Sequence, residues 1–349
     1  MKVFVFRLLI LFPIFSYAQP KLPEKVLICG VCKDVEGRLQ NSIHIMEKIG
    51  GLFGDYRILV YENNSKDQTP GILKRWSLTN PKVIVRCEWC DDKYFSYTII
   101  NREFKNQFAR TERISRARNI VQDLAISREY EEFPYIIWME MDFKTMPPLE
   151  AIVEVFKADR EWDAVFAYGI EAYNQYYDWF AHRDKNFPIG PELFGVKWWQ
   201  MNKTCVLNKT DDWYPVYSGF GGCGIYKKSS VVDCHYSALV TPDFENVVRE
   251  ILDQGRMSSH PQILNYYNQL KELKGVLALP RPVPNMKKYE DPNIGFILNS
   301  DFPDPVIWKM DNYMFQYPSV CEHVTFHASM IVRGHGKLFV NPRLIFKYE

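Results

Sequence analysis

The stretch YIIWMEMDF, residues 135–143, ends a run of strand-forming apolar residues with two carboxylates, Glu140 and Asp142. Side chains two positions apart on a strand point to the same side of a sheet, so these two acids repel each other. Burial would make their charges still more costly, and we therefore expect a cation between them. Because hard divalent cations prefer carboxylate oxygens, Glu140 and Asp142 are the predicted ligands of Mn²⁺ or Mg²⁺. Two solvated acids at the start of a loop are the alternative.

Around this stretch the chain alternates between strand and helix patterns. Apolar runs predict strands at 25–34, 56–64, 82–89, 135–143 and 162–170, and helical spacing or end signals predict helices at 37–53, 69–78, 114–127 and 147–156. This alternation predicts an α/β fold with a mostly parallel sheet flanked by helices. Ligands of such sheets bind beyond the carboxyl ends of the strands. Lys33-Asp34, Glu62–Asp67 and Glu140–Asp142 all fall at those ends, which predicts a site there.

Composition narrows the class of function. The 349 residues are 47% apolar, which suits either two domains or one large α/β unit. A formal net charge of +1 argues against broad binding to nucleic acid, which needs a basic surface. Aromatic residues gather at 173–180 and 198–199, and such clusters either line carbohydrate sites or build a core.

The N-terminus carries a targeting pattern. Lys2 and Arg7 precede an apolar run, and Ser16-Tyr17-Ala18 provides a small-x-small cleavage site, so residues 1–18 are a predicted signal peptide. A short uncleaved membrane anchor is the alternative. The predicted location is the lumen of the secretory pathway, the periplasm or the outside of the cell. The eight cysteines are expected to be buried thiols or disulfides rather than zinc ligands.

Three further motifs carry candidate binding residues. Glu62, Asn64 and Asp67, after the second predicted strand, suit hydrogen bonds to a ribose or nucleobase, although an Asn- and Asp-rich turn is the alternative. Arg113, Arg116 and Asn119 are three apart, which places them on one helix face that can meet a diphosphate or remain solvated. Gly221 and Gly222 would let a sugar approach the backbone, or form a bulged turn before a strand.

These motifs, taken in order, resemble the nucleotide-diphospho-sugar glycosyltransferases of the GT-A fold. The matching stretches are LICGVCKDVEGRL, VYENNSKDQT, RISRARN, the acid-x-acid pair and FGGCGIYKK. Within that group the chain most resembles the capsule-associated mannosyltransferase-like family, in Arg113, Ala117, Arg118 and Asn119 and in YDWFAHRD, residues 177–184. The similarity covers about residues 25–235 and 317–342. The chain departs from the family in having Glu-Met-Asp where an Asp-x-Asp-like metal motif is usual.

The resemblance implies the remaining roles. It implies transfer of a hexose, such as mannose from GDP-mannose, to a glycan or glycoconjugate acceptor, with residues 25–170 binding the nucleotide sugar and residues 171–349 the acceptor. Arg118 would belong to the nucleotide site, and Asp178, Arg183 and Asp184 would bond sugar hydroxyls, with Asp184 also a candidate catalytic residue. A late carboxylate, Glu322, would be the general base if the enzyme inverts. His327, on a stretch expected to be a strand, would complete the metal shell.

Two other functions remain open from the sequence. A nucleotidyltransferase shares the fold and the acidic pair, but a Gly-rich, lysine-containing loop is expected after its first strand, where this chain has GVCKDVEGR. A carbohydrate-binding module without catalysis would keep the aromatic residues and lose metal and nucleotide binding.

Overall fold

The computed structural model describes residues 21–90, 97–99, 105–171, 176–188, 190, 206–238, 241–254, 281–282, 294–299, 306–309 and 320–348. The predicted signal peptide at 1–18 and the aromatic residues Tyr173, Trp198 and Trp199 lie outside this part of the chain.

A central eight-stranded sheet organises the structure, in the order β3-β2-β1-β5-β8-β6-β12-β7. Its strands are β1 Leu22–Cys32, β2 Phe53–Asn63, β3 Val83–Glu88, β5 Tyr135–Met139, β6 Ala164–Ile170, β7 Tyr214–Pro215, β8 Cys223–Lys227 and β12 Leu338–Lys347. Strand β8 runs antiparallel between β5 and β6, and β7 is antiparallel to β12, whereas the other strands share one direction. The predicted class, an α/β fold with a mostly parallel central sheet flanked by helices, is confirmed.

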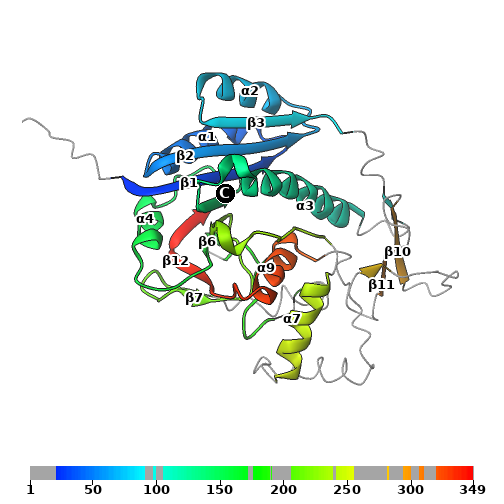
Figure 1. The fold of residues 1–349 in the computed structure, drawn as a ribbon. Helices are drawn as coiled ribbons and strands as arrows, with labels where there is room; N and C mark the ends of the chain where they lie inside the picture. Colours follow the sequence, from blue (N-terminus) through cyan, green and yellow to red (C-terminus); the bar gives the residue numbers. More distant parts are fainter. Residues whose placement is uncertain are drawn as a thin grey trace, which may run out of the picture.

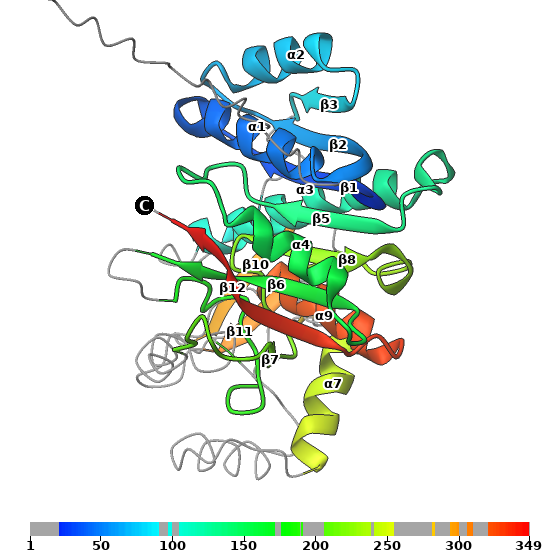
Figure 2. The ribbon, with the colours of Figure 1, turned by 90° about the vertical axis from the view of Figure 1, so that its left-hand side faces the viewer.

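Helices cover both faces of this sheet (Figure 1). They are α1 Glu36–Gly50, α2 Thr69–Thr79, α3 Lys105–Ile126, α4 Leu149–Lys157, α7 Pro242–Asp253 and α9 Glu322–Val332, with short 3₁₀ turns η2 Arg128–Tyr130 and η4 Lys228–Ser230. Figure 2 shows α1 and α4 in front of the sheet, with α3 and α9 behind it. The strands β4 Tyr97–Ile99, β9 Arg281–Pro282, β10 Ile294–Asn299 and β11 Val306–Lys309 pair in a second, antiparallel sheet.

Successive side chains of each strand point to opposite faces of the sheet, so the sheet has a hydrophobic core on each side. Leu27 and Cys29 of β1 face the core beneath α3 and α9, whereas Val26 and Ile28 face the core beneath α1, α2 and α4. The result is a three-layer structure in which strand ends, rather than strand faces, are left for a ligand.

One predicted element is wrong. The stretch after Glu322, His323-Val-Thr-Phe, is rich in β-branched and aromatic residues and so predicts a strand, but it forms helix α9. Every residue from Glu322 to Met330 is buried or nearly so, and a helix buried on all sides shows no amphipathic period in its sequence.

Candidate active site

A cleft of about 560 Å³ opens at the carboxyl ends of β1, β2 and β5. It is lined by Val31, Cys32, Lys33, Asp34, Val35, Asn63, Arg110, Arg113, Ile114, Ala117, Arg118, Glu140, Met141 and Asp142. The cleft therefore lies where the polar strand ends predicted a site. Four basic and three acidic side chains line it, so one formal positive charge remains to attract an anion.

Helix α3 supplies one wall through a single stripe of residues. Arg110, Arg113, Ile114, Ala117 and Arg118 follow the i, i+3, i+4, i+7, i+8 spacing that places side chains on one face of a helix. Ala117 is small enough to bring the helix close to the strand ends, while the arginines flank it. An arginine-bearing face of α3 is thus present, but it consists of Arg110, Arg113 and Arg118 rather than the predicted Arg113, Arg116 and Asn119.

The other two members of the predicted helix face have partners elsewhere. Arg116 pairs with Glu112 one turn earlier, at 2.8 Å. The Asn119 amide donates to the carbonyl of Tyr236 at 2.9 Å and accepts from its N–H at 2.7 Å, which ties α3 to the loop after β8. The nucleotide-binding role predicted for Asn119 gains no support from these contacts.

The acidic pair projects from the end of β5. The N–H of Glu140 donates to the carbonyl of Gly222 at 2.9 Å, which fixes the first acid. Met141 is 1% exposed and packs in the core beneath α1, α2 and α4, and Glu140 and Asp142, on either side of it in the chain, line the cleft. About 35% of each acidic side chain remains exposed, which leaves both accessible to a ligand.

Each acid has one arginine beside it. Arg118 Nη2 lies 3.3 Å from Glu140 Oε1, and Arg38 Nη1 lies 3.8 Å from Asp142 Oδ2. These guanidinium groups supply part of the cationic charge expected near the pair. The compensation is incomplete, since burial raises the pKa of Glu140 to about 7 against the opposing effect of Arg118, with Asp142 adding to the rise. Burial also raises the pKa of Asp142.

The residues of the pair fit a hard divalent cation. Asp142 Oδ1 is buried and accepts no hydrogen bond from any described residue, so it retains its capacity to coordinate. Within the described ranges no three His, Cys, Asp or Glu side chains form a metal-binding group. Glu140 and Asp142 would therefore supply two ligands, and ligand phosphates and water the rest, which is the usual arrangement for Mg²⁺.

Arg118 is the most enclosed charge at the cleft. It is 2% exposed and its guanidinium lies 4.9 Å from the ring centre of Phe220 and 5.4 Å from that of Trp138. Besides Glu140 it approaches Glu322, with Nε 3.4 Å from Oε1. Although burial lowers the pKa of Arg118, the carboxylates of Glu322 and Glu140 raise it by more, so the group stays charged.

The three residues predicted for the ribose or nucleobase instead shape the strand ends. Glu62 is buried and accepts from the N–H of Ser65 at 2.8 Å. Asn64, at φ 58°, bonds both the N–H and the carbonyl of Cys90. Asp67 accepts from the N–H groups of Glu36 and Thr69.

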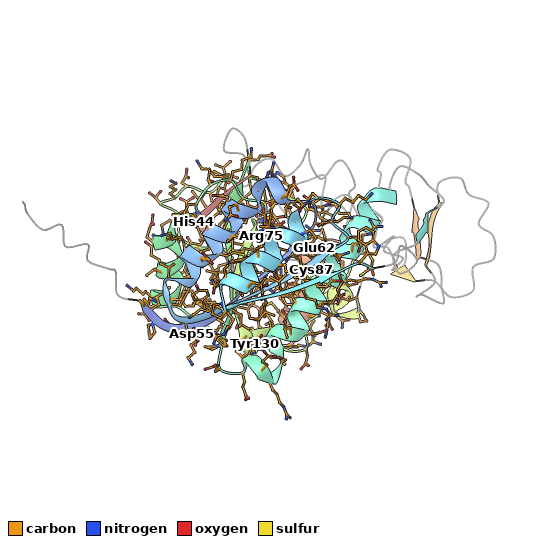
Figure 3. All side chains as sticks on the ribbon, turned by 90° about the horizontal axis from the view of Figure 1, so that it is seen from above. His44, Asp55, Glu62, Arg75, Cys87 and Tyr130 are labelled. Atoms are coloured by element: carbon orange, nitrogen blue, oxygen red, sulfur yellow. The ribbon has the colours of Figure 1, made fainter. Side chains whose placement is uncertain are left out.

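Figure 3 places Glu62 beside Cys87 at the carboxyl end of the strands, with Asp55 at the other end. These contacts match the turn alternative.

The glycine pair also forms a turn. Gly221 and Gly222 have φ of 58° and 87°, and a Cβ at either position would overlap protein atoms: the Ala167 carbonyl at Gly221, and the rings of Phe143 and Tyr348 at Gly222. Neither glycine lines the cleft. The space predicted for a sugar is filled by the chain itself.

The predicted catalytic and metal residues of the second half do not line the cleft. Asp184 accepts from Tyr214 Oη, at 2.8 Å, and from the backbone of Asn186 and Phe187, and it lies 3.2 Å from His182. Desolvation is outweighed by His182 and the other donors, which lower the pKa of Asp184 to about 2. The loop-building role is evident, whereas the catalytic role stays a prediction.

His327 and Glu322 both belong to α9. His327 Nδ1 lies 2.9 Å from Ser218 Oγ and Nε2 lies 3.0 Å from Tyr226 Oη, so neither ring nitrogen is available to a metal in this arrangement. Burial, with Arg118 adding to it, lowers the pKa of His327 to about 3. Glu322 does not line the cleft, but it pairs with Arg118, which does.

Arg110 and Asn63 were missed by the sequence analysis. Arg110 stands three residues before Arg113, so extending the helix face by one turn would have found it. Asn63 ends β2 and could have been included as the last residue of that strand.

Two other expectations concern the whole chain. The described cysteines are free thiols, and Cys205 lies outside the described residues. No helix in the described part of the chain is long and apolar enough to cross a membrane.

The structure is that of an α/β protein with a cleft at the carboxyl ends of its strands. No family model matches the chain, and comparison with curated proteins gives no significant match. The narrower resemblance to the capsule-associated mannosyltransferase-like family is therefore not confirmed.

The solved structures similar to this chain include nucleotide-sugar glycosyltransferases. Staphylococcus aureus TarS is 12% identical, with a TM-score of 0.34, over 61% of this chain and 30% of TarS. The mannosyltransferase PcManGT from Pyrobaculum calidifontis, in complex with GDP-Man and Mn²⁺, is 14% identical, with a TM-score of 0.36, over 70% of this chain and 59% of its own. Mannosyl-3-phosphoglycerate synthase from Rubrobacter xylanophilus is 10% identical, with a TM-score of 0.35, over 82% of this chain and 87% of its own. At these values the similarities say nothing about the substrate of this chain.

Proposed function

We propose that the chain is a glycosyltransferase that moves a hexose from a nucleotide-diphosphate sugar to a glycan or glycoconjugate acceptor, assisted by Mn²⁺ or Mg²⁺. The observation that carries the proposal is the cleft itself, in which a pair of carboxylates, one with a buried unpaired oxygen, faces a stripe of arginines. Phosphates can pair with the arginines, and a dication can pair with the carboxylates. A diphosphate with a bound dication therefore compensates both sets of charges, whereas either partner alone compensates one set.

Each wall of the cleft has a distinct task in this proposal. Arg110, Arg113 and Lys33 bind the diphosphate through charge-assisted hydrogen bonds. Glu140 and Asp142 would hold the metal, which when bound supplies positive charge to the diphosphate leaving group. During transfer the bond from the anomeric carbon to the phosphate oxygen breaks and a bond to the acceptor hydroxyl oxygen forms.

Transfer also removes the proton of the acceptor hydroxyl. If the enzyme inverts, Glu322 is our candidate to take the proton from the acceptor hydroxyl, and if it retains, no such base is required. The resemblance favours mannose as the hexose and GDP-mannose as the donor. An exposed aromatic residue, Tyr177, stacks on Tyr348 at 3.7 Å between ring centres and would face an acceptor sugar.

Ligand-linked melting tests the proposal. We expect a nucleoside diphosphate to raise the melting temperature only when Mn²⁺ or Mg²⁺ is present. At a ligand concentration 100 times its Kd, the free energy of unfolding should increase by about 2.7 kcal/mol. A panel of nucleotide sugars incubated with metal then identifies the donor by hydrolysis. A chain that shows no metal-linked shift with any nucleotide, and hydrolyses no donor, is not a metal-assisted glycosyltransferase.

We further propose that residues 1–18 direct the chain into a secretory or periplasmic compartment. The charged start, short apolar run and Ser16-Tyr17-Ala18 support cleavage after Ala18. N-terminal sequencing of the exported protein should begin at Gln19. A protein that starts at Met1 and stays with the membrane fraction would indicate the anchor instead.

A further inference from the structure

Arg118 joins two parts of the molecule that are far apart in the chain. It lies on α3, Glu140 follows β5, and Glu322 is the first residue of α9. The guanidinium donates a hydrogen bond from Nη2 to Glu140 at 3.3 Å and forms an ion pair with Glu322, with Nε 3.4 Å from Oε1. Arg118 and Glu140 line the cleft and Glu322 does not, so Arg118 connects the cleft to the start of α9.

The surroundings restrict Arg118 to this arrangement. The rings of Trp138, Phe220 and Tyr236 enclose the guanidinium, with ring centres 4.9–5.8 Å from its central carbon. The group is 2% exposed at the edge of the cleft that it lines, and its Nε and Nη1 donate a hydrogen bond to no described residue. A guanidinium also has a planar set of donors in fixed directions, which lets it hold two carboxylates at once, whereas an ammonium cannot impose such directions.

We infer that Arg118 is a positioning residue that fixes the distance between Glu140 at the donor cleft and Glu322 at the start of α9. It acts through these two acids rather than as a ligand of the diphosphate. This inference rests on the proposed function for its kinetic consequence, but the three-residue contact itself is independent of the reaction.

A double-mutant cycle on stability tests the contact without any substrate. The single variants Arg118→Met and Glu322→Gln, and the double variant, are compared by urea unfolding. The double variant should lose clearly less stability than the two single losses added, because each single change already breaks the same pair. The same cycle with Arg116→Met should be additive, since Arg116 lies on α3 but pairs with Glu112. Additivity in the Arg118 cycle would overturn the inference.

Kinetics with the Arg118→Lys variant separates positioning from mere stability. Lysine keeps the charge, so it should recover most of the melting temperature lost in Arg118→Met. Because it cannot direct two carboxylates, kcat for donor hydrolysis should stay at least tenfold below wild type, while the nucleotide Kd at saturating Mn²⁺ changes less than threefold. A lysine variant with wild-type kcat would show that only the charge matters, and a tenfold weaker Kd would identify Arg118 as a phosphate ligand.

The two proposals fail in different ways. If the wild-type protein binds no nucleotide with metal, the glycosyltransferase proposal fails while the stability cycle still decides the Arg118 contact. If the wild type is active and Arg118→Lys is fully active, the positioning role fails alone.

Discussion

At the scale of single residues, Asp142 shows ligand binding and stability in conflict. Burial raises its pKa, so the folded protein disfavours the charge that a metal site needs. We expect Asp142→Asn to leave the melting temperature of the free protein unchanged or slightly higher at neutral pH, because the neutral amide removes a buried charge. The same change should abolish the metal-linked shift with nucleotide, and thermal melting with and without Mn²⁺ measures both.

Asp159→Asn is the matched control, because Asp159 is exposed and does not line the cleft. It should keep the full metal-linked shift. A lower melting temperature for free Asp142→Asn would show that Asp142 is structural, and a retained shift would remove it from the metal site.

Arg113 provides a second test at this scale. It lines the cleft one helical turn from Arg110, where it can donate charge-assisted hydrogen bonds to a phosphate. Because such a bond contributes roughly 1.5–3 kcal/mol, Arg113→Gln should weaken nucleotide binding about tenfold or more, and reduce the salt dependence of the Kd measured by calorimetry. Arg116→Gln, on another face of α3, should leave the Kd unchanged, and equal losses in both variants would contradict the assignment.

The positions of the polar residues at strand ends and on helix faces were easier to predict from the sequence than their hydrogen-bond partners. The acidic pair and Arg113 line the cleft, and their places could be predicted because a strand end and a helix face each follow from local spacing. Glu62, Asn64 and Asp67 were also placed correctly at a strand end, but their hydrogen bonds to neighbouring loops depend on contacts between separate segments.

At the scale of elements, the strands and helices predicted between residues 25 and 170 are present, although α3 begins at Lys105 rather than at residue 114 and β5 ends at Met139 rather than at residue 143. Helix α4 begins after Pro148, for example, as the prolines at its start indicated. Two features could not be predicted from the sequence pattern. Helix α9 is buried all round and so lacks a period, and the reversed direction of β8 depends on its long-range pairing with β5 and β6.

The turn before β8 gives a stability prediction. Gly221 combines a φ of 58° with a backbone carbonyl, that of Ala167, where a Cβ would lie. Gly221→Ala should therefore cost both backbone strain and a steric shift of the neighbouring strand, roughly 3 kcal/mol or more in urea unfolding.

Gly334 after α9 is the matched control for this prediction. It has a φ of 86°, but a Cβ added at this position would meet no described atom within 4 Å, so Gly334→Ala should cost only about 1–2 kcal/mol of backbone strain. Equal losses for the two variants would mean that close packing at Gly221 contributes nothing.

At the scale of the whole molecule, the two halves of the sequence share one sheet. Strands β8 and β12, from beyond residue 171, pair with β5 and β6 from before it. The acidic pair, α3 and α9 are thereby brought together although they are separated by up to about two hundred residues. Any ligand that orders the cleft should stabilise this common sheet rather than one half.

The buried histidines of α9 predict how stability depends on pH. Burial and the charge of Arg118 lower the pKa of His327 to about 3, and lower that of His323 as well. The unfolded chain binds protons at these histidines below about pH 6.5, whereas the folded protein does not, so stability should fall as pH decreases from about 6.5 toward 3. Glu140 acts in the opposite sense between pH 7 and 4.5, since its folded pKa is raised.

Replacement of one histidine isolates this effect. Each buried neutral histidine contributes a slope of at most about 1.4 kcal/mol per pH unit, so His327→Gln should flatten the pH dependence of the unfolding free energy by about that amount between pH 4 and 6. His44 is exposed on α1, as Figure 3 shows, and His44→Gln should leave the slope unchanged. The slope, rather than the stability at one pH, is the decisive measurement, because His327→Gln also alters the hydrogen bonds with Ser218 and Tyr226. An unchanged slope in His327→Gln would show that the folded protein protonates this ring as readily as the unfolded chain does.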